Sequence, residues 1–315
     1  MSEEFPTLTV SLPPEQAGQR LDQVLAQLWP QFSRSRLQHW MAEGALEVDG
    51  RQPRPRDRVV GGEKVVLRAV WEEDTRVLPE ALQLDVVHKD RGLFVINKPA
   101  GLVVHPGAGN RAGTLQNALL ALDPKLARVP RAGIVHRLDK DTSGLLVVAR
   151  TPDAHARLVE MLAEREIERS YLALCHGVLS GGGTVDAPIG RHRTARIKMA
   201  VRPDGREAIT HYRIERRFAA HTLLRVQLET GRTHQIRVHL AHIGFPIVGD
   251  PVYGGRKRFP AGASPALRAA LAAFPRQALH AARLAFEHPL SGAPLEFEAP
   301  LPDDFAALLE ALARA

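Results

Sequence analysis

Short apolar runs of strand length, repeated along the chain beyond residue 83, most constrain the fold. They are Leu84–Val87, Leu93–Ile96, Leu145–Ala149, Tyr171–Leu174, Ile209–Ile214 and Leu223–Leu228. Some neighbouring runs are separated by turns of hairpin length, and others by helical stretches at about Pro152–Arg165, about Thr233–Ile243 and Pro302–Ala313. Strands connected in both ways are typical of an α+β domain. We therefore predict a mixed, mostly antiparallel sheet with flanking helices.

A smaller unit precedes this domain, over residues 16–70. Its first helix is predicted at Gln19–Trp29, because the apolar residues there fall on one stripe, Leu21, Val24, Leu25 and Leu28. A second helix follows, and strand-like pieces lie at Ala45–Val48 and Lys64–Arg68. The acidic segment 71–83 lacks periodicity and contains a proline, which indicates a linker. The predicted organisation is a tail at 1–15, the small domain at 16–70, the linker at 71–83 and the larger domain at 84–315.

The charge of the chain points to a polyanionic partner. The 42 Lys and Arg residues outnumber 35 Asp and Glu residues, for a net charge of +7 and a pI of about 10.0. The stretch 191–206 is basic and holds one acid, Asp204. Two arginines open the second predicted helix, where the helix dipole disfavours cations. A solvated surface is the common fate of such residues, but the whole pattern favours RNA phosphate contacts by Arg34, Arg36, Arg191, Arg193, Arg196 and Lys198.

Several classes of protein are excluded by residues that the sequence lacks. A single cysteine, Cys175, excludes an internal disulfide and a cluster of thiolate metal ligands. No run approaches the roughly 20 apolar residues of a membrane span, and the opening is acidic, so we expect a cytoplasmic protein. There is no phosphate-binding loop, dinucleotide fingerprint or metalloprotease motif. The histidines of the predicted helix at about Thr233–Ile243 have no carboxylate beside them, so we expect neither a metal nor a cofactor.

The segment from Arg131 to Ala149 is the richest in chemically useful side chains. We predict that an apolar strand leads into a polar loop and that Gly144 opens a second apolar strand. Loops held between rigid strands often carry catalytic groups. In an extended loop, Arg137 and Asp139 would point to the same face and could share a pocket. The common alternative is a charged turn in solvent.

The motif His136-Arg-Leu-Asp139-x-x-Thr-Ser-Gly144 resembles the signature of the RluA-type family of pseudouridine synthases. Further stretches match that family in order along nearly the whole chain, at Asn97–His105, Arg169–Ala173, Gly231–His239 and Leu279–Pro289. The small domain resembles the S4 RNA-binding module in its helix order, its Ser-Arg-Ser-Arg run and its Val-Asp-Gly turn. So many ordered matches are very improbable by chance.

The resemblance implies a substrate and a reaction. It implies that the chain converts uridine to pseudouridine in large-subunit (23S) rRNA, at several uridines of the helix 69 stem-loop, and so supports maturation of the large subunit. The RNA would be free or part of a pre-ribosomal particle, and the enzyme a monomer that needs no small-molecule cofactor and no membrane. The base must leave its stack before a protein group can reach ribose C1′.

The resemblance also assigns roles to five residues. Asp139 would be the catalytic carboxylate, since glycosidic cleavage through a cation-like sugar is assisted by a nucleophilic or electrostatic carboxylate. Arg237 would pair with it, and Arg137 would fill the space of the flipped base. Tyr171 would stack on the uracil and serve a proton transfer, and Leu284 would wall the pocket. Taken alone, Arg237 could equally face solvent and Tyr171 could pack in a core.

Two other functions fit parts of the sequence. A glycoside hydrolase could use Asp139 and Asp141, which on a strand would lie about 6.5–7 Å apart, within the inverting range of about 6.5–9.5 Å. Such a pair mechanism needs both carboxylates, whereas a pseudouridine synthase should retain substantial activity in Asp141→Asn. A non-catalytic RNA-binding or ribosome-assembly factor would need neither of them.

Overall fold

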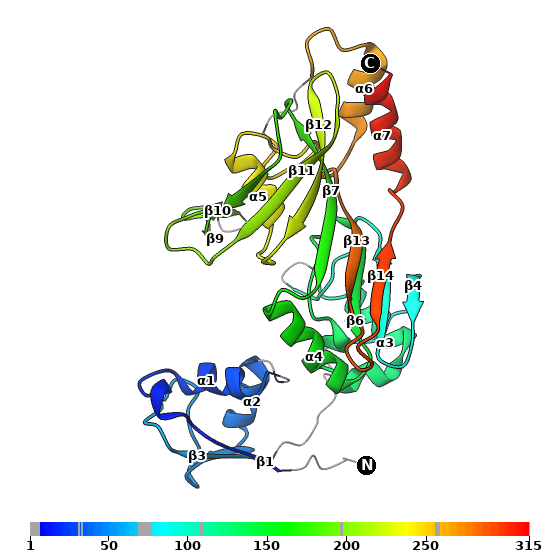
Figure 1. Cartoon of the computed structure of the whole chain (residues 1–315). Helices are drawn as coiled ribbons and strands as arrows, with labels where there is room; N and C mark the ends of the chain where they lie inside the picture. The colour runs from blue at the N-terminus through cyan, green and yellow to red at the C-terminus, as the bar shows by residue number, and fades with distance from the viewer. Residues whose placement is uncertain are drawn as a thin grey trace.

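The computed structural model describes residues 7–30, 32, 34–68, 77–107, 110–195, 198–255 and 259–314 (Figure 1). Within these ranges the strands form one nine-stranded, one three-stranded and one two-stranded sheet. The buried apolar residues between Leu12 and Leu67 form a cluster separate from the core of the nine-stranded sheet. Each of the two larger sheets therefore has a hydrophobic core of its own, which is the physical requirement for a separate domain.

The small domain is a three-stranded antiparallel sheet covered by two helices. It contains β1 (Leu8–Ser11), β2 (Leu46–Val48), β3 (Lys64–Leu67), α1 (Leu21–Leu28), α2 (Arg34–Ala42) and the 3-10 turn η1 (Pro14–Gln16). The strands lie in the order β1-β3-β2. The expected tail at 1–15 is therefore wrong for residues 8–11, since Leu8 pairs with Leu67 and Ser11 with Lys64. The S4-like nature of this domain stays a prediction.

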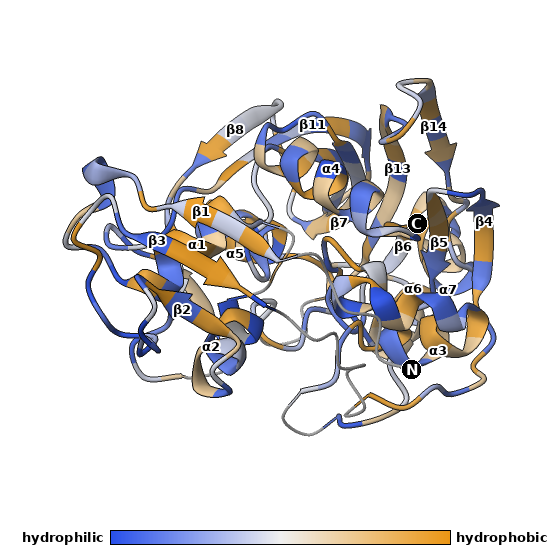
Figure 2. Cartoon of the chain, turned by 90° about the horizontal axis from the view of Figure 1, so that it is seen from below, coloured by the Kyte–Doolittle hydropathy of each residue, from blue (hydrophilic) through white to orange (hydrophobic). Residues whose placement is uncertain are grey.

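The large sheet has the strand order β4-β5-β6-β13-β7-β12-β11-β8, with β14 also paired to β13. Its strands are β4 (Asp85–Lys89), β5 (Leu93–Lys98), β6 (Ser143–Ala149), β7 (Glu168–His176), β8 (Gly183–Asp186), β11 (Ile209–Arg217), β12 (His221–Leu228), β13 (Leu279–Glu287) and β14 (Pro294–Glu298). The pairing of β13 with β6 is parallel and the other pairings in this sheet are antiparallel. In Figure 2, hydrophilic and hydrophobic residues alternate along β14, whose Leu295 and Phe297 pack against the core, as in a strand with one covered face.

Helices flank the large sheet. They are α3 (Leu115–Leu122), α4 (Pro152–Ala163), α5 (Gln235–His242), α6 (Pro265–Ala273) and α7 (Asp303–Ala313), with 3-10 turns η2 (Pro124–Arg128) and η3 (Pro130–Gly133). Thr151 caps α4 by accepting a hydrogen bond from the backbone N–H of Ala154, and Pro152 occupies the first turn. Figure 1 places α3 and α4 beside the part of the sheet that holds β4 and β6. In the described ranges, no helix has the length and apolar character that a membrane crossing requires.

Several elements were not predicted. The strand β13 lies at the centre of the sheet, yet its apolar pattern is interrupted by His280 and Arg283. β8, β14, α3, α6 and the small sheet of β9 (Ile189–Arg191) with β10 (Met199–Val201) were also missed. The apolar strand expected before the polar loop is wrong, because residues 130–133 form η3 and Ile134 makes an isolated bridge to Val148. A run of two or three apolar residues is too short to specify a strand.

Candidate active site

A cavity of about 1630 Å³ opens beside the polar loop that precedes β6. Its wall is formed by that loop, by the β7 residues Arg169 and Tyr171, and by the segment from Gly231 into α5. Arg36 of the small domain also lines it. The volume is ample for a nucleotide and its neighbours, since pockets for small ligands usually measure about 300–1,000 Å³.

The loop presents alternate side chains to the cavity and to the core. Leu138 is buried in the main hydrophobic cluster, while Arg137 is exposed and Asp139 is partly covered. Arg137 and Asp139 both line the cavity. An extended backbone places every second residue on one face, which explains why these two side chains share the same space.

A buried lysine fixes the position of the polar loop that carries Asp139. Lys98, at the end of β5, is fully buried, and its ammonium donates hydrogen bonds to the carbonyls of Pro99 (2.8 Å), Leu102 (3.0 Å) and Lys140 (3.0 Å). The same Lys140 carbonyl accepts the backbone N–H of Gly101 at 2.9 Å. The residue that directly follows Asp139 is therefore fixed to a second loop, which limits how far the carboxylate can move.

The protonation of Lys98 makes the stability of the protein depend on pH. Burial lowers the pKa of Lys98 to about 7, against the pull of the charges on Asp141 and Asp139. An unfolded lysine keeps its proton up to about pH 10.4. Between these values the unfolded chain binds more protons, so stability rises with pH. We expect the free energy of unfolding of wild type, measured with denaturant, to rise by about 2 kcal/mol relative to that of Lys98→Met between pH 6.5 and 9. A difference between the two proteins that does not change with pH would contradict this.

The far end of the loop is fixed by close approach of two strands. Gly144 in β6 has φ +110°, and a Cβ at this position would lie 2.2 Å from the carbonyl oxygen of Ala281 in β13. Gly144 and Ala281 are register partners in the parallel pair. Only glycine permits both this conformation and this separation of the strands. The motif's glycine is therefore explained by packing.

Arg237 reaches the carboxylate from α5. The helix start is anchored by Gln235, whose side-chain amide donates to the Ile209 carbonyl and the Thr210 hydroxyl of β11. Arg237 lies in the same first turn of α5 and is 4% exposed. Its Nη1 donates to Asp139 Oδ2 at 2.9 Å, and its Nε and Nη2 donate to Asp250 at 2.7 and 2.9 Å. The structure therefore brings Asp139 and Arg237 into direct contact.

Asp250 completes a buried charge network that sequence reasoning missed. Its side chain is fully buried and also accepts the backbone N–H groups of Val252 and Tyr253 at 2.8 and 2.9 Å. Burial raises the pKa of Asp250, but the hydrogen bonds and charge of Arg237 bring it below its ordinary value. Burial likewise opposes the charge of Arg237, yet Asp250 and Asp139 raise the pKa of Arg237 above its ordinary value. Both groups are ionised, and Arg237 is fixed in the orientation that serves Asp139.

His234 and Tyr253 are two further site residues that were missed. His234 lines the cavity in a left-handed conformation, with Nε2 3.9 Å from Asp139 Oδ1. Its Nδ1 lies 2.8 Å from the Tyr253 hydroxyl, and the Arg237 guanidinium carbon lies 5.1 Å from the Tyr253 ring centre. The stretch Gly231–His239, which includes His234, matched the family pattern, so a signal existed for this residue, but it carried no indication of a partner.

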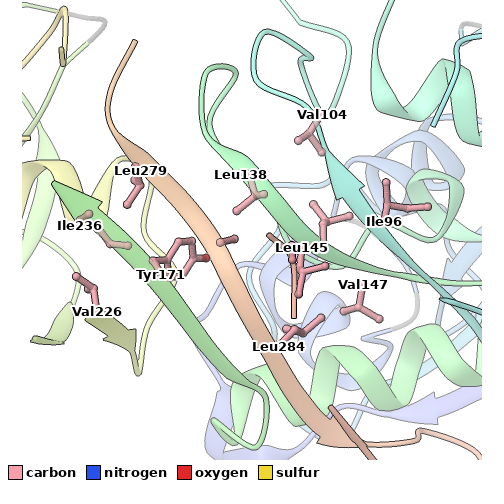
Figure 3. Close-up of a cluster of buried hydrophobic side chains, with 14 of the residues drawn as sticks. Ile96, Val104, Leu138, Leu145, Val147, Tyr171, Val226, Ile236, Leu279 and Leu284 are labelled. Atoms are coloured by element: carbon pink, nitrogen blue, oxygen red, sulfur yellow. The ribbon is translucent and has the colours of Figure 1, made fainter. Parts of the chain in front are cut away.

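Tyr171 lies in the apolar wall of the cavity. It is 6% exposed and pairs with Val226 of β12 and Ala281 of β13. Figure 3 shows its ring among the side chains of Ile236, Leu279 and Leu138. Burial raises the pKa of Tyr171 above its ordinary value, so the hydroxyl keeps its proton at neutral pH. The ring is thus both part of the core and part of the cavity surface.

Leu284 does not occupy its expected place. It is 1% exposed in β13, opposite Arg169 and Phe297, and it is absent from the described residues that line the cavity. Its register position explains this, because it lies three residues along β13 from Ala281, the partner of Tyr171. Leu279, at the start of the same strand, lines the cavity instead.

The six basic residues expected to contact RNA have different surroundings. Arg34 donates at 2.8 Å to the buried carboxylate of Asp22, which also explains why this cation is tolerated at a helix start. Arg36 lies over the Trp40 ring at 5.7 Å. The remaining ones fall in or near the small β9–β10 sheet: Arg191 ends β9, Arg193 and Lys198 lie in the connection, and Arg196 lies outside the described residues.

Comparison with known proteins identifies the family. Residues 92–242 match the model of a family described as RNA pseudouridylate synthase. Over 301 residues, 96% of this chain and 91% of the relative, the chain is 57% identical to ribosomal large subunit pseudouridine synthase D of Xanthomonas campestris pv. campestris. This chain belongs to the RNA pseudouridylate synthase family. The synthase of the same name from Pseudomonas aeruginosa is 56% identical over 96% of this chain and 94% of the relative.

Solved structures of the family agree. The human RNA pseudouridylate synthase domain containing 4 has a TM-score of 0.59 and 28% identity, covering 73% of this chain and 93% of that chain. The human RNA pseudouridylate synthase domain containing 1 has a TM-score of 0.55 and 26% identity, and the match covers 74% of this chain and 89% of that chain. The predicted family, the α+β fold on a mostly antiparallel sheet and the class of enzyme, a pseudouridine-forming isomerase, are confirmed.

Membership in the pseudouridine synthase family contradicts both alternative functions. The geometry also opposes a hydrolase pair of Asp139 and Asp141. Among the described residues, Asp139 lines the cavity and Asp141 does not. The backbone carbonyl of Asp141 instead accepts a hydrogen bond from Arg276 at 3.2 Å. The second carboxylate near Asp139 is Asp250, which is fully buried and occupied by Arg237.

Proposed function

We propose that this pseudouridine synthase modifies large-subunit rRNA, at several uridines of the helix 69 stem-loop, with Asp139 as the catalytic carboxylate. The observation that carries the catalytic part is the direct hydrogen bond from Arg237 to Asp139 at the wall of the cavity. The choice of RNA is supported by the relatives, which are named ribosomal large subunit pseudouridine synthase D and match nearly the full chain.

Four residues that line the cavity have a part in the proposed reaction. Arg137 takes the space that the target base leaves when it flips out of its stack, since a planar guanidinium stacks well on bases. The base then lies against Tyr171. Asp139, which accepts a hydrogen bond from Arg237, assists cleavage of the bond between uracil N1 and ribose C1′. The base turns, C5 bonds to C1′, and the base then loses its C5 proton and gains a proton at N1.

The small domain and the basic stretch around β9 and β10 would hold the rest of the RNA. Arg36 lines the same cavity as Asp139, so an RNA bound at the catalytic loop would pass the small domain. Arg191, Arg193, Arg196 and Lys198 would contact phosphates. Such contacts raise affinity without choosing a sequence, so the selection of uridines would come from RNA structure.

Chemical mapping of pseudouridine in an unmodified large-subunit rRNA transcript tests this function. We expect wild-type enzyme, without added metal or cofactor, to mark discrete uridines in helix 69. A transcript with those uridines replaced by cytidine serves as the control and should stay unmarked. If the marks fall elsewhere in the rRNA, the proposed target is wrong. If purified large-subunit precursor particles are marked and the free transcript is not, the substrate is the assembled particle.

A further inference from the structure

Arg169 is a buried cation without an acidic partner among the described residues. Three arginines of the described ranges have less than a tenth of their surface exposed: Arg169, Arg237 and Arg276. Arg237 contacts Asp250 and Asp139, and Arg276 contacts Asp304 at 2.6 Å. The Arg169 guanidinium instead makes two long hydrogen bonds, to the carbonyls of Leu228 (3.5 Å) and Glu229 (3.4 Å), and its Nε has no partner.

A buried charge that lacks a counterion is costly to the fold, because the interior solvates ions poorly. A residue of this kind in a cleft is a candidate for binding a ligand, which would supply the missing interactions. At 7% exposure Arg169 keeps unused donors on the inner wall of the cavity, where it is one of the lining residues. The surrounding backbone makes room for it: a Cβ at Gly231 would lie 3.0 Å from Arg169 Nη1.

The position of Arg169 relative to Tyr171 decides which ligand group it would meet. Both residues belong to β7 and are two apart, so they lie on the same face of the sheet. Both line the cavity, with Tyr171 in its apolar wall. The positive charge of Arg169 is also felt at the Tyr171 hydroxyl, whose pKa it lowers against the larger effect of burial. A base stacked on Tyr171 would therefore bring its polar edge within reach of Arg169.

We propose that Arg169 binds the uracil that lies against Tyr171 and stabilises the negative charge of the base when its bond to C1′ breaks. This inference rests on the proposed function. When the C1′–N1 bond breaks, its electron pair stays with the base and spreads over N1, O2 and O4. The base later forms the C5–C1′ bond, loses its C5 proton and gains one at N1. A preorganised cation in a water-poor site is suited to the anionic stage.

Arg169→Met tests the inference, with Arg169→Lys as the charge-conserving variant. The control is Arg157→Met, which removes a partly exposed arginine of α4 that pairs with Glu160 and does not line the cavity. In single-turnover reactions at saturating rRNA transcript, we expect Arg169→Met to lower the rate about 100-fold. We expect Arg169→Lys to stay within about tenfold of wild type and Arg157→Met within about twofold. The Kd of the RNA should change by less than about threefold in all three.

A transcript with 5-fluorouridine at the target positions distinguishes a role of Arg169 in the reaction from a role in the fold. If Arg169 were only structural, its replacement would lower the rate equally on both transcripts. Fluorine stabilises the departing anion, so the loss of Arg169 should matter less. We expect the defect of Arg169→Met in consumption of the target nucleotide to shrink below about tenfold. An equal defect with both transcripts, together with a lowered Tm, would show a structural role and overturn the inference.

Two other results separate the inference from the proposed function. If Arg169→Met weakens RNA binding and its salt dependence but keeps the rate at saturation, the residue binds a phosphate and the inference is wrong. If wild type is active on the transcript and Arg169→Met is equally active, the inference alone fails. If wild type leaves both transcript and precursor particles unmarked, the proposed function fails and the inference falls with it.

Discussion

Replacing Asp139 with asparagine is expected to lower the rate of pseudouridine formation by about 10⁴-fold or more, with RNA binding within about threefold of wild type. Asparagine has the same shape and can still accept the hydrogen bond that Arg237 Nη1 donates at 2.9 Å. It has no negative charge to stabilise or bond to C1′. The fold should persist, because Arg237 keeps its two hydrogen bonds to Asp250.

Asp141→Asn is the matched control, since it removes the same charge two residues away in a side chain that does not line the cavity. We expect it to keep at least half of the wild-type rate. Single-turnover mapping of the transcript gives the rates, and filter binding gives the Kd. An active Asp139→Asn preparation would remove this carboxylate from the mechanism, and an equal loss in Asp141→Asn would favour a paired mechanism.

Replacing Arg237 with alanine is expected to lower the free energy of unfolding by about 3–5 kcal/mol and the Tm by about 10 °C, in addition to abolishing activity. The substitution leaves the buried Asp250 carboxylate without its cation and removes the donor to Asp139. Arg237→Lys keeps a charge, but an ammonium cannot serve one carboxylate with two parallel bonds and reach a second. We expect it to be intermediate in stability and strongly reduced in rate.

The pH dependence of stability tests the contribution of the buried Asp250 carboxylate. Since the pKa of Asp250 in the folded protein is below its ordinary value, its contribution is present above about pH 4 and is lost as the pH falls further. The stability advantage of wild type over Asp250→Asn, from denaturant unfolding, should therefore shrink between about pH 5 and 3. An advantage that stays constant over this range would show that Asp250 stabilises through packing.

Local patterns determined much of the protein from sequence. The 3.6-residue period located α1 to within a few residues, and the helical stretch predicted at about Pro152–Arg165 corresponds to α4. The apolar runs located six strands of the large sheet and its antiparallel character. The ordered motifs identified the family and directed attention to Asp139. These features depend on residues close together in the chain, which is why a sequence pattern can report them.

Contacts between distant segments were decided only by the tertiary structure. Lys98 and Lys140 are 42 residues apart, and Arg237 and Asp139 are 98 apart. The contact between Lys98 and Lys140 was not predicted, and the contact between Arg237 and Asp139 was expected only from family resemblance. Periodicity tells which face of an element a residue occupies, but not which element packs against that face.

The charges around the cavity show the same division. The sequence alone showed that the loop at 136–143 carries arginine and aspartate, but its predicted strand began at Tyr171 and left Arg169 out. Only the tertiary structure decided that Arg237 has two carboxylates, that Arg169 has none among the described residues, and that Leu284 lies away from the cavity. Whether a buried cation has a counterion depends on the packing of strands and helices far apart in the chain, and that packing sets its chemistry.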